Sequence, residues 1–372
     1  MSMQHYAIVL LLWGQSVLAA DPVVRYVKHG DHTVAAVVPA AAGLLHTRQM
    51  LSTDSDAGIL FRQVEQLVST FGGDPRQLVK VNVVASTPEI ADAARAALTH
   101  APASFVVGAL PHGEKIGIDV IAVAGEKPPL RFLSAAYLPK GPRLYVSGQA
   151  EKGVTPADAA AKTIGSLLKT LGSFGATKDD IVQAKCFLTP MAAASDVVAE
   201  FEKVFGELRV PPLVFVEWTS DLPIEIELIA AAPPAAADAP AVEYLTPPGM
   251  KPSPLFARVV RINRGDIVYT SGLYSKEPGS GEQQILSIFE QLQDVLKRTG
   301  SDLRHLAKAT YYVGDADASK QLNEIRPRFY DPARPPAASK AMVAGAGMKD
   351  RSIGIDIIGV VVPGPSTNTI KP

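Results

Sequence analysis

Residues 224–230 read Ile-Glu-Ile-Glu-Leu-Ile-Ala, and this stretch decides the fold because the chain contains it in three versions. The other two are Ile-Gly-Ile-Asp-Val-Ile-Ala at 116–122 and Ile-Gly-Ile-Asp-Ile-Ile-Gly at 353–359. Apolar residues alternate with other residues at the start of each version, which is the period of a β-strand. A strand that recurs at long intervals indicates repeated units, so we expect three divergent copies of one small domain.

Each unit carries a second alternating strand upstream of the first, at residues 78–84, 181–187 and 306–312. An amphipathic helix precedes that strand. In the second unit, Ile164, Leu167, Leu168 and Leu171 recur at helical spacing, and Gly172 is predicted to end the helix.

Another helix and a proline-containing turn follow the second strand in each unit. The helices are predicted at residues 88–98, 193–205 and 318–329. Each unit therefore reads strand, strand, helix, strand, helix, strand, strand. This order predicts an α+β fold with both helices on one face of a mixed sheet.

Composition shifts give the predicted boundaries. The domains are expected at residues 23–125, 126–232 and 251–363, with an Ala/Pro-rich linker at 233–250 and a disordered tail at 364–372.

Residues 1–20 resemble a secretory signal, because an apolar run at 6–13 leads to the small residues Ala19 and Ala20. Cleavage is predicted between Ala19 and Asp21, which would place the protein in the periplasm or outside the cell. No Lys or Arg precedes the run, and a mis-assigned start or a frayed apolar tail is the alternative. The run is too short to cross a bilayer, which takes about 20 apolar residues.

Charge and cysteine content exclude several classes of protein. Basic residues number 36 and acidic residues 37, without a basic cluster, so a nucleic-acid partner is not expected. Cys186 is the single cysteine, so no intramolecular disulfide can form. The seven histidines lack the spacing of metal ligands, and no phosphate-binding loop is present, so we expect neither a metal nor a cofactor.

Two stretches suggest a family. Residues 143–149 read Arg-Leu-Tyr-Val-Ser-Gly-Gln, and 266–273 read Asp-Ile-Val-Tyr-Thr-Ser-Gly-Leu. They resemble the early strand of the RidA/YjgF (Rid, YER057c/UK114) family, which ends in Ser-Gly. The likeness covers nearly all of the second and third units. In the first unit Thr47 and Arg48 stand at the Ser-Gly position, and its assignment depends on the helix order and the terminal strand.

This resemblance implies chorismate-mutase-like domains, which associate in threes around a central barrel and bind ligands between neighbours. Three units in one chain then suggest an intramolecular pseudo-trimer, expected to be monomeric, although further assembly is the alternative.

The resemblance also implies an activity, the hydrolysis of enamines or imines to carbonyl compounds and ammonia. In the family an arginine after the proline turn holds the substrate carboxylate, and a strand glutamate helps to position water. Here the arginine position holds Ala103 or Pro102 in the first unit, Leu213 in the second and Ala338 in the third. The glutamate is retained once, as Glu225, because the other two units have glycine there.

Candidate site residues follow from this comparison. Glu225 is the candidate catalytic residue, and the candidate ligand-binding residues are Ser147, Gly148, Ser271, Gly272, Asn323 and Lys340. One active cleft is predicted to combine Glu225, Ser271, Gly272, Asn323 and Lys340. The plain alternatives are an exposed strand carboxylate for Glu225, a solvated lysine for Lys340 and a polar helix residue for Asn323.

Three functions remain open from the sequence. The first is an exported protein that binds a small metabolite between its units and hydrolyses imines. The second is a ligand-binding or scaffold protein without catalysis, favoured by the loss of the arginine. The third and weakest is ribonuclease activity, since no basic track is present.

Overall fold

The computed structural model describes residues 23–125, 131–132 and 134–362. The predicted signal at 1–20 and the tail at 364–372 lie outside these ranges. Among the described residues, no helix combines the length and apolar character needed to cross a membrane.

The first unit contains nine elements: β1 (Arg25–His29), β2 (His32–Val38), β3 (Leu44–Thr47), β4 (Met50–Ser52), α1 (Ala57–Thr70), β5 (Gly73–Ala85), α2 (Pro88–Ala97), β6 (Ala103–Val107) and β7 (Ile116–Ala124). The second follows with β8 (Arg131–Phe132), β9 (Ala135–Leu138), β10 (Arg143–Gln149), α3 (Pro156–Gly172), β11 (Ile181–Leu188), α4 (Ala194–Phe205), β12 (Leu213–Glu217) and β13 (Ile224–Ala231). The third comprises β14 (Val242–Leu245), β15 (Val259–Ile262), β16 (Asp266–Thr270), β17 (Leu273–Tyr274), α5 (Gly281–Thr299), β18 (Leu306–Val313), α6 (Ala316–Ile325), β19 (Ala337–Met342) and β20 (Ile353–Val361).

The helices begin and end for local reasons. Asp56 caps α1, because its side chain accepts hydrogen bonds from the backbone of Gly58 and Ile59. Ser280 and Gln283 form a capping box at the start of α5, and Gly300 ends that helix with a left-handed φ of 88°. The last residue of α3 is Gly172, as predicted, and Ser173 is the C-cap.

Three mixed sheets run through the molecule, in the orders β6-β5-β7-β3-β9-β8, β12-β11-β13-β10-β15-β14 and β1-β2-β16-β20-β18-β19. Each has one parallel pair, which is β5 with β6, β11 with β12, or β18 with β19. The first hairpin of each unit belongs to another unit's sheet: β9 pairs with β3, β15 with β10, and β2 with β16. The three units are therefore connected by main-chain hydrogen bonds as well as by side chains.

The predicted linker is partly structured. β14 lies inside 233–250 and pairs with β15, so this stretch contributes an edge strand to the second unit's sheet.

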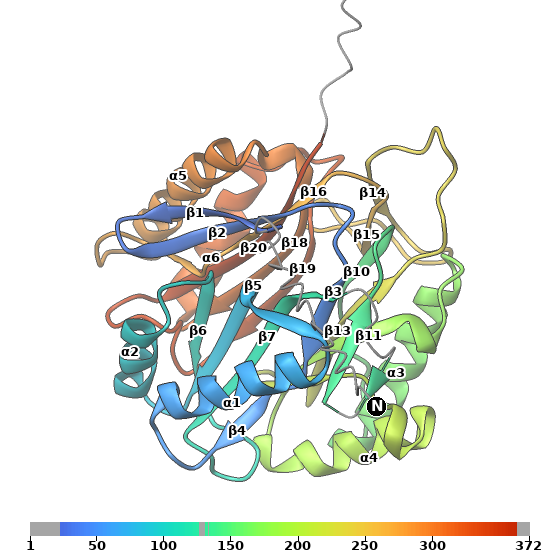
Figure 1. The fold of residues 1–372 in the computed structure, drawn as a ribbon, viewed down its shortest axis with the longest axis horizontal. Helices are drawn as coiled ribbons and strands as arrows, with labels where there is room; N and C mark the ends of the chain where they lie inside the picture. Colours follow the sequence, from blue (N-terminus) through green and yellow to red (C-terminus); the bar gives the residue numbers. More distant parts are fainter. Residues whose placement is uncertain (1–22, 126–130, 133, 363–372) are drawn as a thin grey trace, which may run out of the picture.

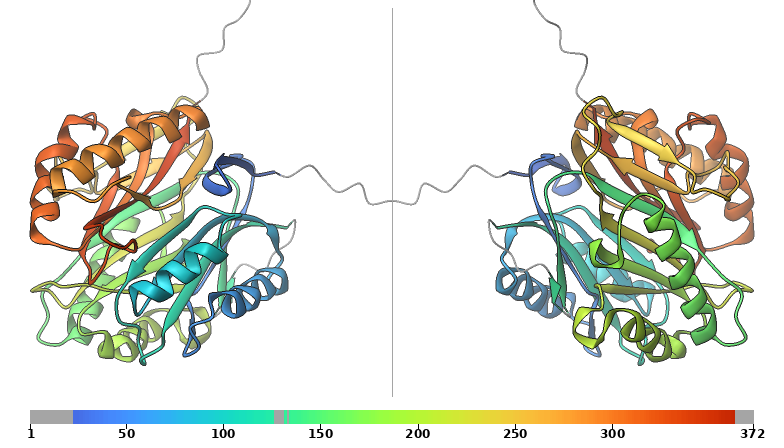
Figure 2. Two further views of the ribbon diagram at one scale, coloured as in Figure 1. Left: turned by 90° about the vertical axis from the view of Figure 1, so that its left-hand side faces the viewer. Right: turned by 90° about the vertical axis from the view of Figure 1, so that its right-hand side faces the viewer.

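Helices cover the outside of the molecule, and the strands fill its interior (Figures 1 and 2). Each unit has its own apolar core between its helices and its sheet. Three further cores are shared between units. One of them contains Val84, Phe187 and Tyr312, which occupy the same position on β5, β11 and β18. The units thus meet through equivalent strand positions.

Candidate functional sites at the seams between units

Three equivalent seams join neighbouring units. Seam 1/2 sets the β3–β4 segment of the first unit against β12, seam 2/3 sets β10 against β19, and seam 3/1 sets the β16–β17 segment against β6. The strand register makes Phe105, Phe215 and Lys340 equivalent, because they lie opposite Val83, Cys186 and Tyr311 on their parallel partners. We use this position to compare the seams.

Seam 1/2 is closed by a glutamine. The Gln49 side chain donates to the Phe215 carbonyl at 3.1 Å and accepts from the Phe215 N–H at 3.2 Å. It lies against Gly117, where an added Cβ would stand 3.0 Å from Gln49 Nε2. Gln49 occupies the place of the family glycine, and it satisfies the strand backbone that would otherwise face a ligand.

Seam 3/1 is closed by a tyrosine. The Tyr274 hydroxyl donates to the Phe105 carbonyl at 3.0 Å and accepts from the Phe105 N–H at 3.2 Å. Its side chain lies close to both Gly272 and Gly354. A Cβ on Gly272 would stand 2.8 Å from the hydroxyl oxygen, and one on Gly354 would stand 2.8 Å from the ring. The guanidinium of Arg95 covers the Phe105 ring, with 4.7 Å from its carbon to the ring centroid.

Seam 2/3 differs from both. Within the described residues, no side chain from the second unit hydrogen-bonds to the backbone of Lys340. Glu225 lies in this seam against Gly148, since a Cβ on Gly148 would stand 1.9 Å from Glu225 Oε1. A side chain at position 148 would therefore require the Glu225 side chain to move.

Burial raises the pKa of the Glu225 carboxyl to about 7, against smaller lowering effects from Ser339 and Lys308. The lowering effect of Ser339 comes from its hydroxyl, which belongs to a buried residue beside the carboxyl. A carboxyl that titrates near neutrality is suited to proton transfer.

Lys340 and Ser147 complete this seam. Lys340 Nζ donates to Ser319 Oγ at 3.0 Å, and burial lowers its pKa, with a smaller contribution from Arg326. Ser147 Oγ donates to the Ala257 carbonyl at 2.6 Å and accepts from the Ala338 N–H at 2.7 Å. Ser147 therefore connects the second unit to the third through two hydrogen bonds.

The structure divides the predicted cleft. Glu225, Gly148, Ser147 and Lys340 share seam 2/3, but Ser271 and Gly272 lie in seam 3/1, where Gly272 N donates to the Ala103 carbonyl at 3.0 Å. The reason is that each β-strand with Ser-Gly faces the following unit. Asn323 is exposed on α6, one turn beyond Ser319.

Sequence reasoning missed Gln49 and Tyr274, which decide whether two seams are open. The strand register places Arg48 and Gln49 at the Ser-Gly position, one residue later than the predicted Thr47-Arg48. The loss of Ser-Gly there was therefore the one signal in the sequence. No comparable signal marked Tyr274, whose partner lies in another unit.

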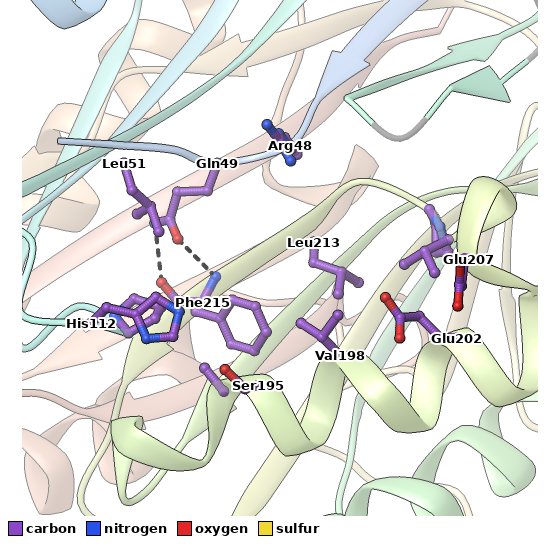
Figure 3. Close-up of a pocket in the computed structure, with 14 residues that line it drawn as sticks. Arg48, Gln49, Leu51, His112, Ser195, Val198, Glu202, Glu207, Leu213 and Phe215 are labelled. Atoms are coloured by element: carbon purple, nitrogen blue, oxygen red, sulfur yellow. Dashed lines mark hydrogen bonds between the residues drawn. The ribbon is translucent and has the colours of Figure 1, made fainter.

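A cavity of about 480 Å³ lies beside Gln49 on seam 1/2 (Figure 3). Val198, Leu213 and Phe215 form an apolar wall, while Arg48 and Glu202 add opposite charges. A second cavity, of about 240 Å³, lies on seam 3/1 and is lined by Arg95, Tyr274 and Ser271 among others. The larger one has the size and mixed lining of a small-molecule site.

Other site chemistry is limited. Among the described residues, no group of three or more His, Cys, Asp or Glu is placed to hold a metal ion. Cys186 is buried, and burial raises the pKa of its thiol. It is therefore unsuited to act as a nucleophile.

Each unit has two helices on a mixed sheet, the units exchange hairpins, and strands with Ser-Gly line two of the seams. These features define a class of α+β protein built from small repeated domains. The chain belongs to the Endoribonuclease L-PSP family, whose model matches residues 128–232 and 250–361, more than half of the chain. These ranges correspond to the second and third units, and the resemblance to RidA/YjgF proteins is confirmed.

Individual proteins resemble single units. Protein DfrA of Myxococcus xanthus is 26% identical over 112 residues, which are 28% of this chain and 84% of that protein. A YjgF-family protein from Neisseria meningitidis is 19% identical, covering 33% of this chain and 97% of that one, with a TM-score of 0.26. The Rid-family protein YyfB from Yersinia pestis, of unknown function, is 20% identical over 32% of this chain and 98% of that one, with a TM-score of 0.30.

Proposed function

We propose that this protein is an exported Rid-type hydrolase that binds a small metabolite between its units and cleaves an imine or enamine at seam 2/3. One observation carries the proposal: the partly buried Glu225 carboxyl, with its pKa near 7, lies in the seam where, among the described residues, no glutamine or tyrosine side chain closes the facing strand backbone. A group with this pKa is present in both protonation states at neutral pH, so it can act as a base and then as an acid.

The reaction would begin with the protonated imine. Glu225 accepts a proton from water as the C–O bond forms and the C=N bond becomes single, which gives a neutral carbinolamine. Glu225 returns that proton to the carbinolamine nitrogen and then takes the hydroxyl proton as the C–N bond breaks and the C=O bond forms. The departing ammonia receives this last proton and leaves as ammonium, together with the carbonyl compound. Glu225 is thereby restored to its starting form.

Lys340 would bind the acid group of the substrate. The family arginine is absent from all three units, and Lys340 lies on the facing strand of the same seam. An ammonium supplies a point charge rather than a two-pronged contact, so substrate affinity should be modest.

The test generates 2-iminopropanoate in situ with an amino-acid oxidase and follows ammonia release. The wild-type protein should accelerate release, Glu225→Gln should abolish the acceleration, and Lys340→Met should raise KM more than it lowers kcat. Glu290→Gln is the matched control, because this glutamate is exposed on α5. Release at the buffer rate with the wild-type protein would reject the hydrolase.

A binding protein without catalysis is the second candidate, favoured by the 480 Å³ cavity on the closed seam 1/2. Arg48 would hold an anionic ligand with an apolar body against Leu213 and Phe215. A thermal-shift screen of keto acids, aromatic acids and amino acids separates the candidates. If the protein is a binding protein without catalysis, the rise in Tm caused by the ligand should disappear in Arg48→Ala and persist in Glu225→Gln.

We also propose that one chain forms the complete three-unit ring. The exchanged hairpins and the equivalent strand positions at the shared cores support it. Light scattering should give a mass near 39.3 kDa or slightly less after signal removal. Export itself is tested by N-terminal sequencing of the protein from a periplasmic extract, which should begin after Ala19 or Ala20.

A further inference from the structure

Equivalent side chains of the three units meet in layers at the centre of the molecule. One layer consists of His46 on β3, Tyr145 on β10 and Tyr269 on β16, which hold the same strand position and are at most 1% exposed. The hydroxyls of Tyr145 and Tyr269 are 3.3 Å apart.

A charged layer lies next to it. It contains three buried lysines, Lys80, Lys185 and Lys308, and three carboxylates, Asp119, Glu227 and Asp356. Lys80 Nζ is 2.7 Å from Asp356 Oδ1, and Lys308 Nζ is 2.7 Å from Glu227 Oε1. With all six groups ionised, this layer is neutral.

Arg143 adds a fourth buried cation, which is 1% exposed and forms no ion pair with a carboxylate among the described residues. Its guanidinium acts on the hydroxyls of Tyr145 and Tyr269 through its charge and through hydrogen bonds. Its Nε and Nη1 have no hydrogen-bond partner. The equivalent positions in the other units hold Leu44 and Ile267, so this cation occurs once around the centre.

His46 is incomplete in the same way. Both of its ring nitrogens are buried and have no hydrogen-bond partner. Burial, and then the charge of Arg143, lower the pKa of His46 to about 3, so the ring is neutral and near that guanidinium. A neutral imidazole still has one N–H to donate, and unpaired buried polar groups are rare in folded proteins.

We propose that a small monovalent anion of about the size of chloride binds between Arg143 and His46 at the centre of the molecule. The guanidinium N–H groups and one imidazole N–H supply the donors, and the anion balances the unpaired charge. This site is separate from the seams, and it does not depend on the proposed hydrolase activity.

The neighbouring cavity is a poorer place for an anion. It has a volume of about 30 Å³ and is lined by Lys185, Lys308, Glu227 and Tyr269 among others. Unpaired oxygens of Asp119 and Glu227 belong to the same charged layer and would repel an anion. A water molecule fits this cavity and could donate to such oxygens.

The test compares the wild-type protein with Arg143→Leu, which reproduces the residue of the first unit. At constant ionic strength, chloride replacing gluconate should raise the wild-type Tm saturably, by about 3–4 °C at roughly 100 times Kd, and should not affect Arg143→Leu. Equal anion responses in the two proteins, or a wild-type response that never saturates, would overturn the proposal.

A crystallographic measurement covers the case in which Arg143→Leu does not fold. Wild-type crystals grown in bromide should show an anomalous peak within about 3.5 Å of Arg143 Nε, where a halide would contact the N–H. His46→Tyr, which restores the tyrosine of the other units, should weaken that peak. A wild-type map with water alone between the two side chains would reject the anion.

Discussion

Seams 1/2 and 2/3 fill the same space from opposite strands. In seam 1/2 the side chain belongs to Gln49 and the glycine opposite is Gly117, whereas in seam 2/3 the side chain belongs to Glu225 and the glycine is Gly148. The fold therefore requires one polar side chain at this place and accepts it from either strand. The chemical result differs, since the amide satisfies a neighbouring backbone while the carboxyl remains free to titrate.

Seam 3/1 shows a third solution. Both positions are glycine there, as Gly272 and Gly354, and the ring of Tyr274 occupies the space. The same space is thus filled by an amide, a carboxyl or a phenol ring in the three seams. A seam can therefore keep its packing while it loses the side chain that the family uses.

The largest effect is expected when both side chains are placed in one seam. Gly148→Gln should destabilise the protein by about 3 kcal/mol, because its Cβ would collide with Glu225. Adding Glu225→Gly recreates the pattern of seam 1/2 and should restore stability to within about 1 kcal/mol of the wild type. Urea unfolding of the two single variants and the double variant measures this coupling. If the losses of unfolding free energy are strictly additive, the two strand positions do not share one space.

The three central carboxylates also differ between units, which sets a pH dependence. Glu227 and Asp356 each have a lysine at 2.7 Å, whereas Asp119 accepts from Asn82 at 2.8 Å, and burial raises its pKa to about 6. The folded protein therefore holds this proton more tightly than the unfolded chain. Stability from this group is present below pH 4 and is lost as pH rises to about 6, by about 2–3 kcal/mol.

Asp119→Asn should remove that part of the pH dependence. Unfolding free energies at pH 4, 5, 6 and 7 for the wild type, Asp119→Asn and the exposed control Asp238→Asn give the measurement. Parallel curves for the wild type and Asp119→Asn would show that Asp119 titrates normally.

Removing the glutamine clamp tests seam 1/2 directly. Gln49→Ala leaves the N–H and carbonyl of Phe215 unpaired in a buried place, which should cost about 2 kcal/mol. Gln63→Ala, on the exposed face of α1, is the matched control and should change the Tm little. If both variants melt together with the wild type, the clamp does not stabilise the seam.

The smallest effect is expected for Tyr274→Phe. The ring remains to fill the space between two glycines, and only the hydroxyl that bonds the Phe105 backbone is lost. A loss of about 1 kcal/mol is expected by thermal or urea denaturation. A loss as large as that of Gln49→Ala would mean that the hydroxyl, rather than the ring, holds seam 3/1 together.

The repeat, the helices and the α+β class could be predicted because their patterns are local. The predicted helix at 193–205 and the observed Ala194–Phe205 differ by one residue at one end. Strand exchange could not be predicted, because alternation in β9 identifies a strand without identifying its partner. Glu225 and Gly148 followed from motif positions, whereas the roles of Gln49 and Tyr274 depend on contacts between residues more than 150 apart in sequence.

The exchanged hairpins have a consequence for damage and repair of the chain. A cut or a proline introduced in β9 would remove an edge from the first unit's sheet, although β9 is encoded within the second. A lesion in one unit would therefore disrupt the sheet of the neighbouring unit. No single unit can be excised with its own sheet intact. The protein should melt in one step, and fragments cut at domain boundaries should regain structure only when mixed.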